Sequence, residues 1–197
     1  MLSARNNQKT YLLSKKLVSF DIIMKIAHLI RIKVFSYEKF NENEKLILDK
    51  FLQLFPFNIK DEKIGLKKTE ATGFHEKKIT IFEIVLTKEK HTNAFLRTLA
   101  GNLDEEQRKL ILSQVESRLD ENLNFFLRFD KNEYLKNNKL ILTHSGNCFH
   151  IEISVAAFPK KKEIGLEILK PFFRKRIVRR IKERTKNCKD EPRHMRP

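Results

Sequence analysis

Apolar and polar side chains alternate from Phe149 to Val155, and the apolar set extends to Ala157. His150, Glu152 and Ser154 form the polar set. The apolar set is Phe149, Ile151, Ile153, Val155 and Ala157. A period of two over this length is typical of a β-strand with one buried and one open face. The chain therefore needs a sheet to hold this strand and a second layer to cover its apolar side.

Other segments predict the partners of this strand. Alternation or β-rich composition indicates strands at residues 28–35, 64–72, 78–86, 124–130 and 139–143. The Lys-rich segment 64–72 is typical of a sheet edge. Residues 139–143 and 148–158 are expected to form a hairpin around Ser145-Gly146-Asn147.

Helical periodicity appears between these strands. It predicts a first helix at 11–20 and a second from Asn41 or Asn43 to Phe55. A helix at 89–99 is expected to end with Gly101 as a left-handed cap, and a helix at 105–119 to begin at the cap residue Asp104. A short helical turn is predicted at 134–135 and a last helix from Lys161. The order predicts an α+β fold, with a mostly antiparallel sheet of about five or six strands and helices on one face.

Three segments carry a family resemblance: TGFHEKKITIFEIVLT (72–87), FFLRFDKNEYL (125–135) and ISVAAFPKKKEIGLEIL (153–169). They resemble an archaeal family of RNA-binding domains described as predicted exosome subunits. The resemblance covers about Lys25 to Phe173. It implies a fold similar to the RNA-binding domain of the ribosomal protein that holds 5S RNA. The family is not known for a basic C-terminal helix.

Positive charge is concentrated at the end of the chain. The net charge is +16, and residues 160–197 hold 15 basic and 5 acidic side chains. Residues 24–159 are nearly balanced, with 22 basic and 19 acidic side chains. Such asymmetry favours a polyanionic partner, although a solvated tail without a partner has the same composition.

The stretch PFFRKRIVRRIKERTK, residues 171–186, predicts a helix with a narrow apolar stripe formed by Phe173, Ile177 and Ile181. Its candidate RNA-binding residues are Arg174, Lys175, Arg176, Arg179, Arg180, Lys182 and Arg184. Guanidinium groups suit phosphate oxygens, and such contacts depend steeply on salt. There are two alternatives. The stripe packs on the body or on a partner while water solvates the basic face, or the helix contacts an anionic membrane surface.

Four further cations are candidates in the body. Arg128 and Lys131 are predicted to reach phosphate, or Arg128 instead pairs with Asp130 or Glu152 on the open sheet face. Lys160 and Lys161 open the last helix, where cations oppose the helix dipole and favour a nearby anion. The aromatic-rich motif of RNA-recognition domains is absent from the sequence, and Phe125 and Phe129 are expected in the core.

The sequence carries no catalytic motif and implies no cofactor. His144, Cys148 and His150 make only a weak metal pattern. The two cysteines fit a reducing, cytoplasmic setting, and no apolar run reaches the ~20 residues of a membrane span.

We therefore expect a non-catalytic RNA-binding protein. Its predicted parts are a basic N-terminal extension (1–23), an α+β domain (24–173) and a basic C-terminal helix and tail (174–197). Its expected partners are structured RNA and exosome or ribosomal components. The alternative is a homodimeric interaction module that uses Ile81, Val85 and Phe126 on the open sheet face.

Overall fold

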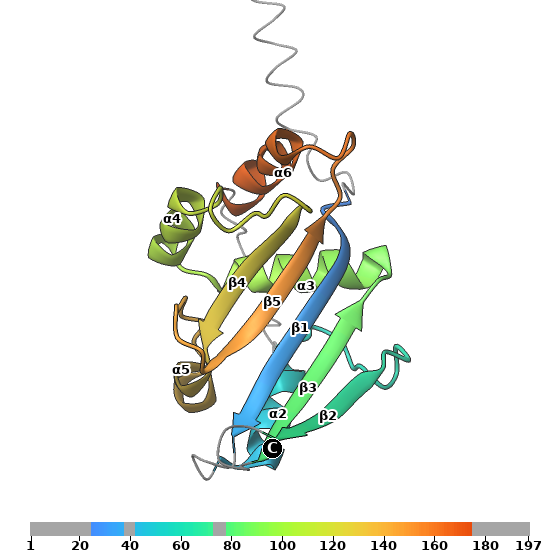
Figure 1. The fold of residues 1–197 in the computed structure, drawn as a ribbon, viewed down its shortest axis with the longest axis vertical. Coiled ribbons are helices and arrows are strands. Elements are labelled where there is room, and N and C mark those ends of the chain that lie inside the picture. Colours follow the sequence, from blue (N-terminus) through green and yellow to red (C-terminus); the bar gives the residue numbers. More distant parts are fainter. Residues whose placement is uncertain (1–24, 38–41, 73–77, 175–197) are drawn as a thin grey trace, which may run out of the picture.

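The structure, a computed structural model, describes residues 25–37, 42–72 and 78–174. The predicted N-terminal extension, the helix at 11–20 and the tail after Arg174 lie outside the described residues. The predicted α+β class is confirmed. Five antiparallel strands form one sheet in the order β2-β3-β1-β5-β4 (Figure 1). The strands are β1 (Ala27–Tyr37), β2 (Leu66–Thr72), β3 (Lys78–Leu86), β4 (Asn124–Asp130) and β5 (Cys148–Val155).

Helices lie mainly on one side of this sheet. They are α2 (Glu44–Gln53), α3 (Glu89–Asn102), α4 (Glu105–Ser113), α5 (Lys131–Asn137) and α6 (Lys162–Arg174). In the view of Figure 1, α2 and α3 cross behind the sheet, and the open face is turned to the reader. No helix in the described segments is long and apolar enough to cross a bilayer.

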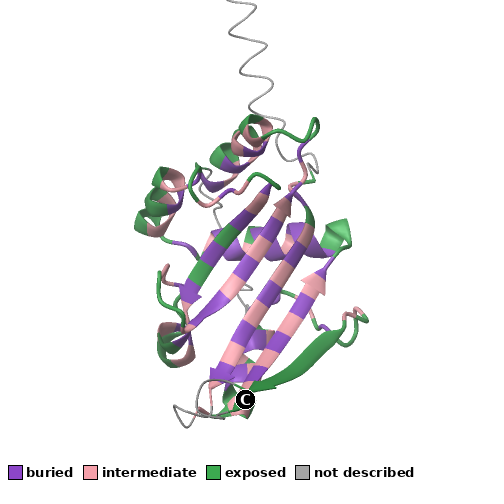
Figure 2. Cartoon of the chain, in the orientation of Figure 1, coloured by how far each residue is buried: buried purple, intermediate pink, exposed green. Residues whose placement is uncertain are grey.

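The core fills the space between the sheet and its helices. The predicted alternation in β5 is confirmed, since Phe149, Ile151 and Ile153 are at most 2% exposed. Figure 2 shows the same alternation as bands of buried and partly exposed residues along the central strands, whereas β2 is exposed throughout. The Phe51 and Phe149 rings stack with centroids 6.3 Å apart, which joins α2 to the sheet. The prediction that β2 is an edge strand is confirmed.

Side-chain caps begin two of the helices as predicted. The Asn43 side chain accepts a hydrogen bond from Leu46 N at 3.0 Å, and Asp104 accepts from Gln107 N at 2.8 Å. The predicted left-handed cap at Gly101 is wrong, because α3 continues to Asn102 and no described glycine has positive φ.

The guanidinium of Arg108 explains why that glycine cap is unnecessary. Its Nη2 donates to Ala100 O at 2.7 Å and to Leu103 O at 2.9 Å. A side-chain donor thereby satisfies carbonyl groups at the end of α3 that a left-handed turn would otherwise pair.

The predicted hairpin between 139–143 and β5 is also wrong. β5 lies between β1 and β4, and both of its edges are occupied. Residues 141–143 instead lie along the outer edge of β4, where Thr143 N donates to Arg128 O at 3.0 Å and Asp130 N donates to Ile141 O at 2.8 Å. These backbone hydrogen bonds pair Leu142 with Phe129 in an isolated antiparallel β-bridge.

The helix predicted over 105–119 ends earlier, at Ser113. Beyond it the chain turns and meets β4, where Phe126 N donates to Arg118 O at 3.0 Å. Leu119 forms a bridge with Phe125, so tertiary pairing replaces the last helical turn. Two short segments therefore line the outer edge of β4.

Candidate nucleic-acid interface

The open face of the sheet carries charged side chains from four strands. One row of side chains crosses four strands, because Arg128 is opposite His150, His150 opposite Lys33, and Lys33 opposite Glu83. Arg31 and Glu152 face one another in the next row. Cations outnumber carboxylates in these two rows, so the distribution of ion pairs decides where positive charge remains.

The carboxylates neutralise the centre of the face. Arg31 Nη1 donates to both carboxylate oxygens of Glu152 at 2.9 Å, and Arg31 Nε lies 3.0 Å from Glu83 Oε1. Lys33 Nζ lies 3.8 Å from the same oxygen of Glu83. The centre of the sheet is therefore an ion-paired network rather than a free cationic surface.

The alternative that Arg128 pairs with Glu152 or Asp130 is wrong. Glu152 is engaged by Arg31, and the Asp130 side chain caps α5 by accepting from Glu133 N at 2.9 Å. Arg128 is exposed and has no ion pair within the described ranges. The uncompensated positive charge consequently lies at the β4 edge.

A second guanidinium approaches the same edge. Arg118 donates from Nε and Nη2 to Gln114 Oε1 at 3.0 and 2.6 Å, and from Nη1 to Phe126 O at 3.3 Å. All of these acceptors are neutral. The hydrogen bonds fix the direction of the guanidinium without neutralising its charge.

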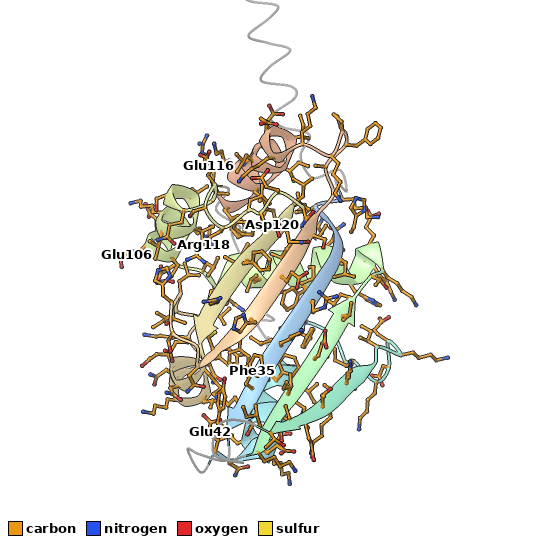
Figure 3. The ribbon with its side chains drawn as sticks, in the orientation of Figure 1. Phe35, Glu42, Glu106, Glu116, Arg118 and Asp120 are labelled. Carbon is orange, nitrogen blue, oxygen red and sulfur yellow. The ribbon has the colours of Figure 1, made fainter. Side chains whose placement is uncertain are left out.

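These side chains surround a hollow of about 360 Å³ on the outer side of β4. It lies between the two short segments that cover the β4 edge, and Figure 3 shows Arg118 between α4 and β4. Its lining contains no acidic residue and consists of Gln114, Ser117, Arg118, Phe126, Arg128, Thr143 and His144.

Electrostatics around the hollow point to an unbalanced positive charge. Burial lowers the pKa of Arg118, and the charge of Arg128 lowers it further. Burial likewise lowers the pKa of His150, with smaller effects of Arg128 and Lys33. The lowered pKa of His150 favours its neutral form, and an anion beside the two arginines would relieve their repulsion.

The structure places the other body candidates differently. Lys160 and Lys161 are exposed in the connection before α6, whose first residue, Lys162, forms an ion pair with Glu121 at 2.9 Å. Arg174 is exposed at the end of α6. The remaining tail candidates lie outside the described residues: Lys175, Arg176, Arg179, Arg180, Lys182 and Arg184.

Lys131 requires a correction, because its side chain is 0% exposed. Its Nζ donates to Phe35 O and to Glu42 Oε2, both at 2.7 Å, and lies 5.1 Å from the Tyr37 ring centroid. The side chain is turned inward at the start of α5 and cannot contact a phosphate. The short LRFDKNEYL stretch gave no indication of this direction.

The predicted packing of the apolar stripe at the chain end is supported at its first position. Phe173 is 1% exposed, and its ring centroid lies 5.7 Å from that of Phe125. Arg174 therefore directly follows a fixed anchor in the core. Ile177 and Ile181 lie outside the described residues.

Sequence reasoning missed Arg118 and the hollow. Arg118 was expected in a helix, and no local pattern joins it to Arg128 or His144. Phe125 and Phe129 are core residues as predicted, but Phe126 is 39% exposed beside the two arginines. No three metal-ligating side chains gather anywhere in the described segments, and Cys148 is buried.

Comparisons with known proteins agree on one family. A family model described as "RNA binding" matches residues 29–155. RNA-binding protein PAB1135 of Pyrococcus abyssi is 31% identical over 138 residues, which are 70% of this chain and 87% of that protein.

Two solved structures share the fold. Protein AF2318 of Archaeglobus fulgidus has a TM-score of 0.64 at 23% identity, covering 74% of this chain and 99% of its own. Mth689 of Methanothermobacter thermautotrophicus has a TM-score of 0.61 at 24% identity, covering 75% of this chain and 98% of its own. The family model matches most of the sheet, and the alignment with the Pyrococcus abyssi protein covers most of that protein's length. The chain therefore belongs to this archaeal family of RNA-binding domains.

Proposed function

We propose that this protein is a non-catalytic, cytoplasmic RNA-binding protein that grips the phosphate backbone of structured RNA. The observation that carries the proposal is the uncompensated pair Arg118 and Arg128, which lies inside the segment that the RNA-binding family model matches. Every nearby carboxylate of the open face serves another group, so these two charges are available to an external anion.

The basic C-terminal segment supplies the second half of the grip. Residues 160–197 hold a surplus of ten positive charges, and Phe173, which directly precedes Arg174, is anchored in the core. Lys160, Lys161 and Arg174 are exposed at the two ends of α6. The proposed contacts extend into the tail through Lys175, Arg176, Arg179, Arg180, Lys182 and Arg184.

Such contacts give affinity without strong sequence preference. A protein of this kind suits an accessory role in RNA processing, with the exosome or ribosomal components as its proposed assemblies. In this proposal the domain at 24–173 is the platform, and residues 174–197 act as an electrostatic clamp.

Filter binding of a structured RNA at increasing salt tests the proposal. In the test variant, Arg176, Arg179 and Arg180 are changed together to Gln. Each lost phosphate contact lowers the slope of log affinity against log salt by about 0.7 to 0.9, so the slope should fall by about 2 to 3.

A matched triple variant controls for net charge. Lys45, Lys88 and Arg97 are exposed on or beside the helices that cover the other face of the sheet. Changing these three to Gln removes the same charge and should leave the slope nearly unchanged. Weak binding by the unmodified protein at low salt, or equal slopes for the two triple variants, would contradict the proposal.

A homodimeric interaction module is the second candidate. Ile81 and Val85 are only partly buried on the open face of β3, and β2 is an exposed sheet edge. Light scattering separates the candidates: a dimer that persists at high salt in a protein with no affinity for RNA would favour this one.

A further inference from the structure

The hollow beside β4 has the geometry of a small binding site. We infer that it holds one unpaired nucleotide, with the phosphate between Arg118 and Arg128 and the base against Phe126. This inference rests on the proposed function and specifies which part of an RNA the β4 edge binds.

Arg118 is preorganised for a phosphate. Gln114 Oε1 holds the Nε and Nη2 groups, and Phe126 O accepts from Nη1. A guanidinium has five N–H donors, so donors remain beyond those in these three bonds. Because the side chain is already fixed, a phosphate that binds it incurs little loss of side-chain entropy.

Arg128 also lines the hollow, from β4. Its carbonyl points away from β5 and accepts from Thr143 N, so its N–H, on the same side of an antiparallel strand, points outward as well. Among the described residues, no acceptor pairs with this N–H or with the Arg128 guanidinium. A phosphate oxygen satisfies both kinds of donor.

Phe126 adds a surface for a base. It is 39% exposed on the open face, and it lines the hollow together with both arginines. Bases stack on aromatic rings only when they are free of their own helical stack. The hollow, at about 360 Å³, is at the lower end of the size range of small-molecule sites, which suits one nucleotide and not a duplex.

The combination favours a nucleotide over an acidic peptide. A carboxylate would satisfy the arginines, but it would leave the exposed ring of Phe126 without a planar partner. A nucleotide presents a phosphate and a flat ring at a fixed separation along one chain, and it matches both features at once.

Fluorescence anisotropy on the full chain tests the inference with three probes of equal length. The first is an RNA hairpin with an unpaired loop, the second is the same hairpin with abasic loop positions, and the third is a blunt RNA duplex. The variants are Arg118→Gln, Arg128→Gln, Phe126→Leu and Phe126→Trp. Arg97→Gln is the control, because it removes the same charge from an exposed site on α3.

The Phe126→Leu variant should weaken binding of the looped hairpin about fivefold or more and leave the duplex and the abasic hairpin unchanged. Phe126→Trp should retain affinity, since it keeps an aromatic face. Arg118→Gln and Arg128→Gln should weaken both hairpins more than Arg97→Gln does.

Failure of this inference is distinct from failure of the proposed function. If the unmodified protein binds none of the probes, the proposed function is wrong. If it binds them but Arg118→Gln, Arg128→Gln and Phe126→Leu all behave like Arg97→Gln, the nucleotide site is wrong and RNA binding by other cations stands. Equal binding of the abasic and intact loops would have the same meaning. Selective binding of an acidic peptide by the hollow would also overturn it.

Discussion

The buried ammonium of Lys131 leads to the sharpest prediction on stability. Lys131→Met removes a charge that is 0% exposed and donates to Phe35 O and to the Glu42 carboxylate. Methionine has nearly the same length and fills the same space, so the change tests the polar contacts rather than the packing. It leaves Glu42, whose side chain is 12% exposed, with Tyr37 N as its hydrogen-bond donor at 2.8 Å.

The expected loss is about 3 kcal/mol in the free energy of unfolding. Removing one partner of a buried ion pair costs about 3 to 5 kcal/mol, because the other charge remains buried without compensation. The lower end applies here, since Glu42 keeps a backbone hydrogen bond and some contact with water. A small domain has only about 5 to 15 kcal/mol of stability, so the loss is large.

Urea unfolding at pH 7 measures this loss, together with a double variant. Lys131→Met combined with Glu42→Gln should recover at least about 1 kcal/mol, because a neutral amide in place of Glu42 leaves no uncompensated charge and still accepts from Tyr37 N. Lys136→Met is the matched control in the same helix. Lys136 is exposed, and its change should stay within about 0.5 kcal/mol.

Three outcomes would refute this account of Lys131. If Lys131→Met lowers the free energy of unfolding by less than about 1 kcal/mol, or by no more than Lys136→Met does, the ammonium is solvated. Additive effects of the Lys131 and Glu42 changes would show that the two side chains do not interact. The slope of free energy against urea must stay constant for the comparison to hold.

Further predictions concern pH, packing and thiol chemistry. A hydrogen bond from Lys90 is the main cause that lowers the pKa of Glu62 from 4.5 to about 2. The contribution of ionised Glu62 to the stability of the folded protein is therefore complete above pH 4.5 and is lost as pH falls towards 2. Urea unfolding at several pH values should show that Glu62→Gln removes this part of the pH dependence. Phe173→Ala should cost about 3 to 5 kcal/mol by opening a cavity against Phe125, and a cost below 1 would contradict the packing of α6. Burial raises the pKa of the Cys148 thiol, so in a Cys188→Ser variant it should react with a thiol reagent only after unfolding, and rapid reaction of the native protein would contradict its burial.

The regular parts of the fold were predictable because their signals are local. The bounds of β3 and β4 match the predicted strands, since alternation begins and ends with the strand itself. The helix caps at Asn43 and Asp104 were also found, because a capping side chain acts on a backbone amide only three residues away. Periodicity and capping therefore identify those helices and strands whose bounds are set by residues within the element itself.

The errors arise where a distant group decides the structure. Arg108 satisfies the carbonyl groups that made Gly101 a plausible cap, and Leu142 lies against β4 although the loop beside it suggested a hairpin with β5. The inward direction of Lys131 depends on Glu42, which is 89 residues away in the chain. No pattern within a short window contains that information.

The candidate site was hidden for the same reason, and net charge alone would have misplaced it. Arg31 is the most central cation of the open face, yet two carboxylates engage it, while Arg118 and Arg128 near the margin have neutral or no partners. A body with nearly equal numbers of basic and acidic residues can therefore still present a concentrated anion site, because ion pairs remove charge unevenly across a surface. In the proposed complex the arginine pair and the C-terminal cations make different numbers of phosphate contacts, so their removal should change the salt dependence to different extents. A salt titration of the Arg118→Gln variant should lower the slope by about 0.7 to 0.9, the share of one phosphate contact, whereas loss of three tail arginines should lower it by about 2 to 3.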